Sequence, residues 1–107
     1  MSDADFSASS EEMLQLHARY RARLLERRNQ MAPLLSAVES NTLTPEARAE
    51  LKSHAHKLAG SGATFGYPVI SEIGIQLENH LAQPELEPIP LAALLRQMLH
   101  AIDTLEP

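Results

Sequence analysis

The 107-residue sequence contains no cysteine and no tryptophan. Disulfide bridges and thiolate metal sites are therefore excluded, and a reducing compartment is permitted. Aromatic residues make up only 4% of the chain, and its apolar fraction is mainly aliphatic residues and alanine, a balance that favours helices over sheets. No apolar run approaches membrane-spanning length, and no basic and then apolar leader opens the chain. A cytoplasmic protein that does not bind membranes is therefore the expectation.

Positive charge is also scarce, because 9 lysines and arginines stand against 14 acidic residues and give a formal net charge of -5. The basic residues cluster only in the short run from Arg19 to Arg28. Nucleic acid is thus not an expected partner, since binding its phosphate backbone needs an extended basic surface. A chain of this length has room for one hydrophobic core, which indicates a single domain.

What the sequence does contain is apolar residues at helical spacing. Residues 1–9 are rich in Ser, Asp and Ala and are expected to form a frayed tail, with one helical domain spanning 10–107. The first helix is predicted to begin at an N-cap, Ser9 or Ser10, and to be kinked or broken near Pro33 before a short continuation. Its buried stripe is predicted to contain Met13, Leu16 or His17, Tyr20, Leu24, Met31, Leu34 or Leu35, and Val38.

Three further helices follow from start and stop signals. Thr44 is predicted to be the N-cap and Pro45 the first residue of a second helix, which ends near Thr64. A third helix is predicted to end near Ala82, and the last helix to follow Pro90. Their buried faces are predicted to carry Ala47, Leu51, Ala55, Leu58, Gly62 and Phe65; Val69, Ile70, Ile73, Leu77 and Leu81; and Leu91, Leu94, Leu95, Met98, Ile102 and Leu105. The predicted class is all-α, an antiparallel four-helix bundle with a kinked or broken N-terminal helix.

The most informative stretch, residues 54–66, lies in the second helix. At about 100° per residue, His56 points roughly 140° away from Leu51 and is expected to face solvent. Lys52 lies one turn before His56 on the same side. The residues one to two turns after it have almost no side chain: Ala59, Gly60 and Ala63.

Gly60 and Gly62 lie inside this helix, where each glycine lowers stability by about 0.5 to 1 kcal/mol relative to alanine. Their presence therefore calls for a structural or functional explanation. Gly62 projects toward the core, where close helix packing explains it. Gly60 projects outward one turn from His56, where a missing side chain would let another protein approach the imidazole. A neutral imidazole is a nucleophile near pH 7. The local groups able to stabilise a phosphoryl group on its nitrogen are Lys52, Lys57 and Ser61.

The run from His56 to Ser61, His-Lys-Leu-Ala-Gly-Ser, is followed by Gly66 and resembles the signature of the histidine-containing phosphotransfer (HPt) family. Leu77-Glu78 in the next helix adds to the resemblance, which covers residues 44–81 by motif. In that family a Gln or Glu at the position of Glu78 hydrogen-bonds the histidine. The resemblance therefore implies that His56 is the phosphoacceptor and that Glu78 fixes its tautomer, which leaves Nε2 as the attacking atom.

The same resemblance implies a phosphorelay carrier in two-component signalling and not an enzyme. Its expected partners are receiver domains of response regulators or of hybrid histidine kinases. No cofactor is expected on this chain, since the Mg²⁺ needed for transfer belongs to the partner receiver. Docking is expected on the small-residue surface around His56, formed by Ala59, Gly60, Ser61 and Ala63, together with nearby apolar side chains of the first helix. One departure from the family concerns Ala59, which replaces the usual Lys or Arg, so Lys52 or Lys57 would have to supply that positive charge.

Two alternatives remain open. The first is a helical adaptor that binds a signalling partner without being phosphorylated, which the replacement at Ala59 favours. The second is a small metal-binding bundle, supported only by His17, His80 and His100 on three different helices. We predict that these three are scattered surface histidines that do not form a metal site. His54, at the border of the buried stripe, is predicted to be a packed structural residue.

Overall fold

A computed structural model describes the backbone of residues 3–105 and the side chains of residues 10–105. Within this range the chain is helical and contains no strand. The α-helices are α1 (Asp3–Met31), α2 (Leu35–Glu39), α3 (Pro45–Ser61), α4 (Pro68–Leu81) and α5 (Pro88–Asp103). Two short 3-10 turns, Ala32–Leu34 and Ala63–Phe65, follow α1 and α3.

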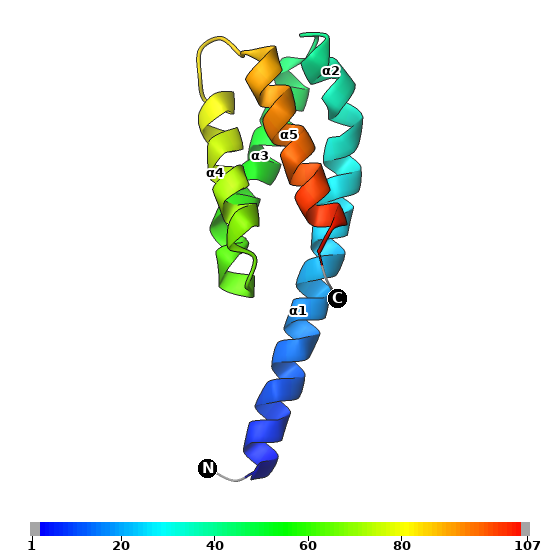
Figure 1. The fold of residues 1–107 in the computed structure, drawn as a ribbon, viewed down its shortest axis with the longest axis vertical. Coiled ribbons are helices and arrows are strands. Elements are labelled where there is room, and N and C mark those ends of the chain that lie inside the picture. The colour runs from blue at the N-terminus through cyan, green and yellow to red at the C-terminus, as the bar shows by residue number, and fades with distance from the viewer. Residues whose placement is uncertain (1–2, 106–107) are drawn as a thin grey trace.

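The N-terminal helix is broken where the sequence predicts it. Pro33 lies in the 3-10 turn between α1 and α2, because a proline lacks the backbone N–H that would continue the α-helical ladder. Together α1 and α2 form one broken element, and α3, α4 and α5 complete an up-down-up-down bundle (Figure 1). The predicted all-α, four-helix architecture is confirmed.

The core lies between these four elements, and α3 and α4 share the most extensive contact. The fully buried large side chains are Leu24, Met31, Val38, Leu51, Leu58, Ile70, Leu77, Leu81, Leu91, Leu95 and Met98. Ala92 and Leu99 are buried as well, so the apolar face of α5 is wider than predicted. Val69 is 53% exposed, and its predicted burial is wrong because it lies off the buried face in the first turn of α4.

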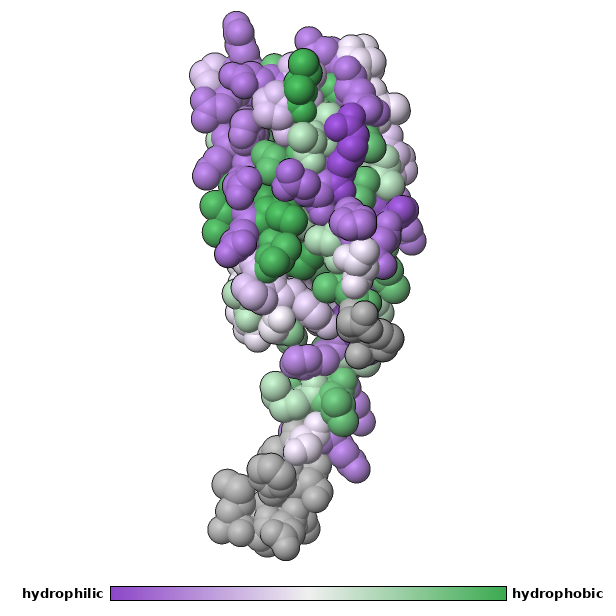
Figure 2. Space-filling view, in the orientation of Figure 1, coloured by the Kyte–Doolittle hydropathy of each residue, from purple (hydrophilic) through white to green (hydrophobic). Residues whose placement is uncertain are grey.

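The N-terminal part of α1 extends beyond the bundle (Figure 1), and the molecule measures 57 × 21 × 20 Å. Met13 was predicted to be buried but is 54% exposed, and of the alternatives Leu16 or His17, Leu16 is 42% exposed whereas His17 is half-buried. The prediction is wrong at Met13, because this section of α1 extends beyond the bundle. Figure 2 shows apolar side chains at the surface of the protruding section.

Two helix starts also differ from the prediction. α1 begins at Asp3, upstream of the expected N-cap at Ser9 or Ser10, because the intervening residues continue the helix. Residues 1 and 2 of the predicted tail lie outside the described range, and the boundary between tail and domain stays a prediction. α5 begins at Pro88, not after Pro90. Prolines are tolerated in a first helical turn, where N–H groups have no intrahelical acceptor.

None of the described helices combines the length and the apolarity that crossing a membrane requires.

Candidate functional site

The site is built on α3, whose start is well defined. The hydroxyl of Thr44 accepts a hydrogen bond from the backbone N–H of Ala47 at 3.1 Å, and Pro45 takes the first helical position. Eleven residues further on, the helix presents His56 to solvent, with 74% of its side chain exposed. The predicted orientation of this imidazole is confirmed.

The imidazole of His56 is held from one side by α4. Its Nδ1 lies 2.6 Å from Oε2 of Glu78, whose side chain is only 30% exposed. Because a carboxylate can only accept a hydrogen bond, Nδ1 carries the hydrogen and the lone pair of the neutral ring is on Nε2. The structure thus brings the predicted phosphoacceptor His56 together with Glu78, the residue predicted to fix its tautomer, and leaves Nε2 as the free nitrogen.

The contact between His56 and Glu78 depends on how closely α3 and α4 approach. A Cβ atom added at Gly74 of α4 would lie 2.7 Å from the backbone nitrogen of Ala59 and 3.0 Å from the carbonyl oxygen of Ala55. Only glycine allows this approach. Glu78 lies one helical turn after Gly74 and so projects from the same side of α4. The sequence interpretation missed Gly74, although a glycine within a helix carries the same cost that drew attention to Gly60.

A second close contact lies at the C-terminal end of α3. A Cβ at Gly62 would lie 2.7 Å from the backbone nitrogen of Ser71, which confirms the predicted close packing. The hydroxyl of buried Ser71 accepts a hydrogen bond from the backbone N–H of Ala63 at 2.7 Å. Gly66 then adopts a left-handed φ of 90° that ends the following 3-10 turn. α4 is therefore tied to α3 at its first turn as well as at Gly74.

The outward surface beside His56 is nearly bare. A Cβ at Gly60 would meet no atom within 4 Å, and Ala63 is exposed beside it. Lys52 is also exposed and lies one turn before His56 on the same side of α3. Ala59 is half-buried against α4 and supplies no charge. The lysine at position 52 is thus the cation that α3 places on the side of the imidazole.

Ser61 and Lys57 lie toward α1 instead. The hydroxyl of Ser61 donates to the carbonyl oxygen of Lys57 at 2.7 Å, which uses its only hydrogen. The buried phenol of Tyr20 must therefore donate to the Ser61 oxygen, 2.8 Å away, and burial raises the pKa of Tyr20 and keeps it protonated. These contacts direct the Ser61 hydroxyl to α1 and not to His56.

His54 is a packed structural residue, as predicted, with only 8% of its surface exposed. Nη1 of Arg27 donates to its Nδ1 at 3.0 Å, so the ring is neutral and carries its hydrogen on Nε2. Burial lowers the pKa of His54, and the positive charge of Arg27 lowers it further. The sequence interpretation did not identify Arg27 as the partner, because the two residues lie on different helices.

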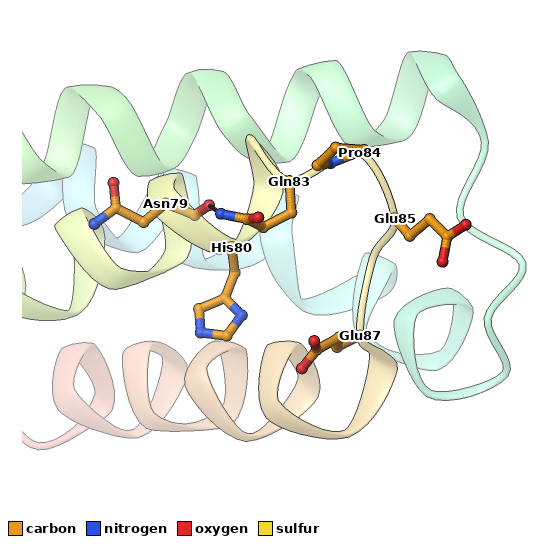
Figure 3. A pocket seen from close by; sticks show the side chains of 6 residues that line it. All are labelled: Asn79, His80, Gln83, Pro84, Glu85 and Glu87. Carbon is orange, nitrogen blue, oxygen red and sulfur yellow. Dashed lines mark hydrogen bonds between the residues drawn. The ribbon is translucent and has the colours of Figure 1, made fainter.

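The remaining histidines do not meet. His80 lines a hollow of about 440 Å³ at the end of α4, where Glu87 lies on the side of His80 and Glu85 points away (Figure 3). His17 lies on α1 and His100 on α5. Across the residues with described side chains, no three His, Cys, Asp or Glu residues are grouped to hold a metal ion. The metal-binding alternative therefore has no site in this range.

Fold and site together define a small helical module that presents one exposed, carboxylate-oriented histidine. A family model described as Hpt domain matches residues 8–105, and the chain belongs to this family. Hpt domains are histidine phosphotransfer relay modules in two-component signalling, and they carry phosphoryl groups without catalytic activity of their own. Searches of curated proteins and of solved structures found no match.

Proposed function

We propose that His56 carries the phosphoryl group and exchanges it with receiver domains of response regulators or of hybrid histidine kinases. The observation that carries this proposal is the 2.6 Å contact between Nδ1 of His56 and the carboxylate of Glu78. This contact holds the ring of an exposed side chain in the tautomer that has its lone pair on Nε2. It orients a nucleophile that a docked protein can reach.

In the accepting direction, the Nε2 lone pair of His56 attacks the phosphorus of an aspartyl phosphate on the receiver. The N–P bond forms while the P–O bond breaks, and the receiver aspartate leaves as a carboxylate. Glu78 offsets the positive charge that develops on the ring, because its carboxylate already accepts the Nδ1 hydrogen. Mg²⁺ bound to the receiver would neutralise phosphate charge. The same steps in reverse return the phosphoryl group to an aspartate.

The surface around the imidazole suits such a partner. Gly60 and Ala63 leave the backbone of α3 open, so a receiver can bring its aspartate close to Nε2 of His56. Lys52 is the cation on this side of the helix, and we assign it the role of balancing phosphate charge in place of the family's usual basic residue at Ala59. Docking of this kind is transient, because a relay must release each partner.

Phosphotransfer from a phosphorylated receiver tests the proposal directly. Wild-type protein should acquire an acid-labile, alkali-stable label, and His56→Gln should abolish it. His100→Gln is the matched control, because it removes another exposed histidine on α5 and should retain full label. Label that persists in His56→Gln would place the acceptor elsewhere.

An adaptor that binds receivers without being phosphorylated is the second candidate, favoured by the absence of a cation at Ala59. The same experiment separates the two functions when binding is measured in parallel by calorimetry. An adaptor would bind the receiver with unchanged affinity in His56→Gln and would take up no label in the wild type.

A further inference from the structure

A groove of about 550 Å³ runs between α1 and α3 on the side of α3 away from Glu78. None of the side chains that line it is acidic, although the chain as a whole has a net charge of -5. The side chains that line it include four cations and two aromatic rings: Arg19, Arg23, Arg27, Lys57, Tyr20 and Phe65. The groove is therefore a local concentration of positive charge on an acidic protein.

The three arginines follow one another at intervals of four residues and so share one face of α1. Like charges at this spacing repel one another, which makes the row unfavourable in the isolated helix. Among the described side chains, Arg19, Arg23 and Arg27 make no ion pair, whereas Arg28 and Arg96 each bind a carboxylate. The row remains available to an external anionic partner.

Contacts between side chains hold the lining of the groove in place. The rings of Tyr20 and Phe65 stack with centroids 4.3 Å apart and planes 10° apart, which forms an apolar floor. Arg27 is held by its hydrogen bond to the neutral His54. Lys57 follows His56 directly in α3, so the groove borders the surface on which the receiver is proposed to dock.

We propose that this cationic groove binds an acidic surface beside the phosphorylated aspartate of the receiver, and that it selects which receivers exchange phosphate with His56. The inference rests on the proposed function and adds a partner of defined charge. The net charge of -5 repels an acidic protein, whereas the cationic groove attracts one. Such an arrangement both orients the encounter and raises its rate.

The test is the second-order rate of transfer from a phosphorylated receiver that carries such an acidic surface. Arg19→Gln combined with Arg23→Gln removes two exposed cations and leaves the contact between Arg27 and His54 intact. We expect about a tenfold lower rate at low ionic strength and a weaker dependence on salt than in the wild type.

A matched control changes the net charge by the same amount at a distance from the groove. Arg21 borders a different hollow between α1 and α5, and Arg96 pairs with Glu39 on another face. The combination of Arg21→Gln and Arg96→Gln should leave the transfer rate within about twofold of the wild type. An equal loss in both double variants would assign the effect to net charge and overturn the role of the groove.

A small phosphodonor, phosphoramidate, separates this inference from the proposed function, because it needs no docking surface. It should label His56 equally in the wild type and in both double variants, as read by mass spectrometry. Equal labelling together with unchanged transfer in the Arg19/Arg23 variant would overturn the groove and leave the phosphoacceptor in place. Absence of label on His56 from either donor in every variant would overturn the proposed function itself.

Discussion

The two flanks of α3 differ in how they meet their neighbours. Toward α4, glycine and alanine bring the backbones into contact at Gly74, and Glu78 then fixes one atom of His56 to within a hydrogen bond. Toward α1, larger side chains hold the helices apart and leave an open groove lined by arginines. The two flanks therefore differ in function under the two proposals: the close flank orients His56, the proposed phosphoacceptor, and the open flank is the proposed binding surface for a receiver.

The largest expected effect on stability comes from placing a side chain at Gly74, where α3 and α4 are in backbone contact. Gly74→Leu places atoms where a Cβ alone would lie 2.7 Å from the backbone of Ala59, and backbone cannot move aside cheaply. We expect a loss of about 2 to 3 kcal/mol in the free energy of unfolding, measured by urea denaturation. Gly60→Ala is the control on the open outer face and should be stabilising by about 0.5 to 1 kcal/mol. Equal effects at the two glycines would refute the assigned close contact.

The next effect concerns the hydrogen bond that the close flank makes possible. Glu78→Ala should slow phosphotransfer to His56 about 10- to 100-fold, the equivalent of a charged hydrogen bond of roughly 1.5 to 3 kcal/mol. The free energy of unfolding should hardly change, because the His56 side chain is exposed. Glu78→Gln should recover part of the rate, since an amide oxygen still accepts from Nδ1. A rate in Glu78→Ala equal to that of the wild type would exclude the tautomer role.

A smaller effect is expected on the outer face between the two flanks. Gly60→Gln adds a side chain to the surface on which a receiver would dock, and it should slow transfer by up to about tenfold, or roughly 1.4 kcal/mol of lost binding. Stability should stay within about 0.5 kcal/mol of the wild type, as for other surface substitutions. Stopped-flow transfer kinetics and thermal unfolding on the same samples measure both quantities. Unchanged kinetics would remove Gly60 from the docking surface.

The smallest expected effect is a pH dependence of the free energy of unfolding, caused by His54 on the side of α3 that faces α1. The pKa of His54 is lowered in the folded protein, so between that value and the usual pKa of about 6.5 the unfolded chain binds more protons. The stabilisation is therefore fully present above about pH 6.5 and is lost as the pH falls below it. In His54→Gln, the free energy of unfolding should fall less steeply than in the wild type below this pH. Parallel curves would show that His54 does not cause the dependence.

Much of this architecture is predictable because it depends on local rules. Pro33 itself predicts the break after α1, and Thr44 followed by Pro45 predicts the start of α3. Helical periodicity predicts most of the core residues. The same periodicity failed at Met13, because it shows which face of a helix is apolar but not whether another element covers that face. The start of α5 was missed at Pro88, since a first turn accepts proline without loss.

For the candidate site, the outward direction of His56 follows from the angle per residue, and the family resemblance singled out Glu78. The contacts that hold the two flanks were not predictable in this way. Gly74 against Ala59 and Arg27 against His54 each join different helices, so no local pattern signals them.

The sequence alone therefore determined the helices, their apolar faces and the exposure of one histidine, since each depends on spacing within a single segment. Only the tertiary structure showed the contact with Glu78 that leaves Nε2 of that histidine free, and the groove that the arginine row lines. Both depend on how closely two helices approach, which is set by the sizes of the residues that meet at their crossing.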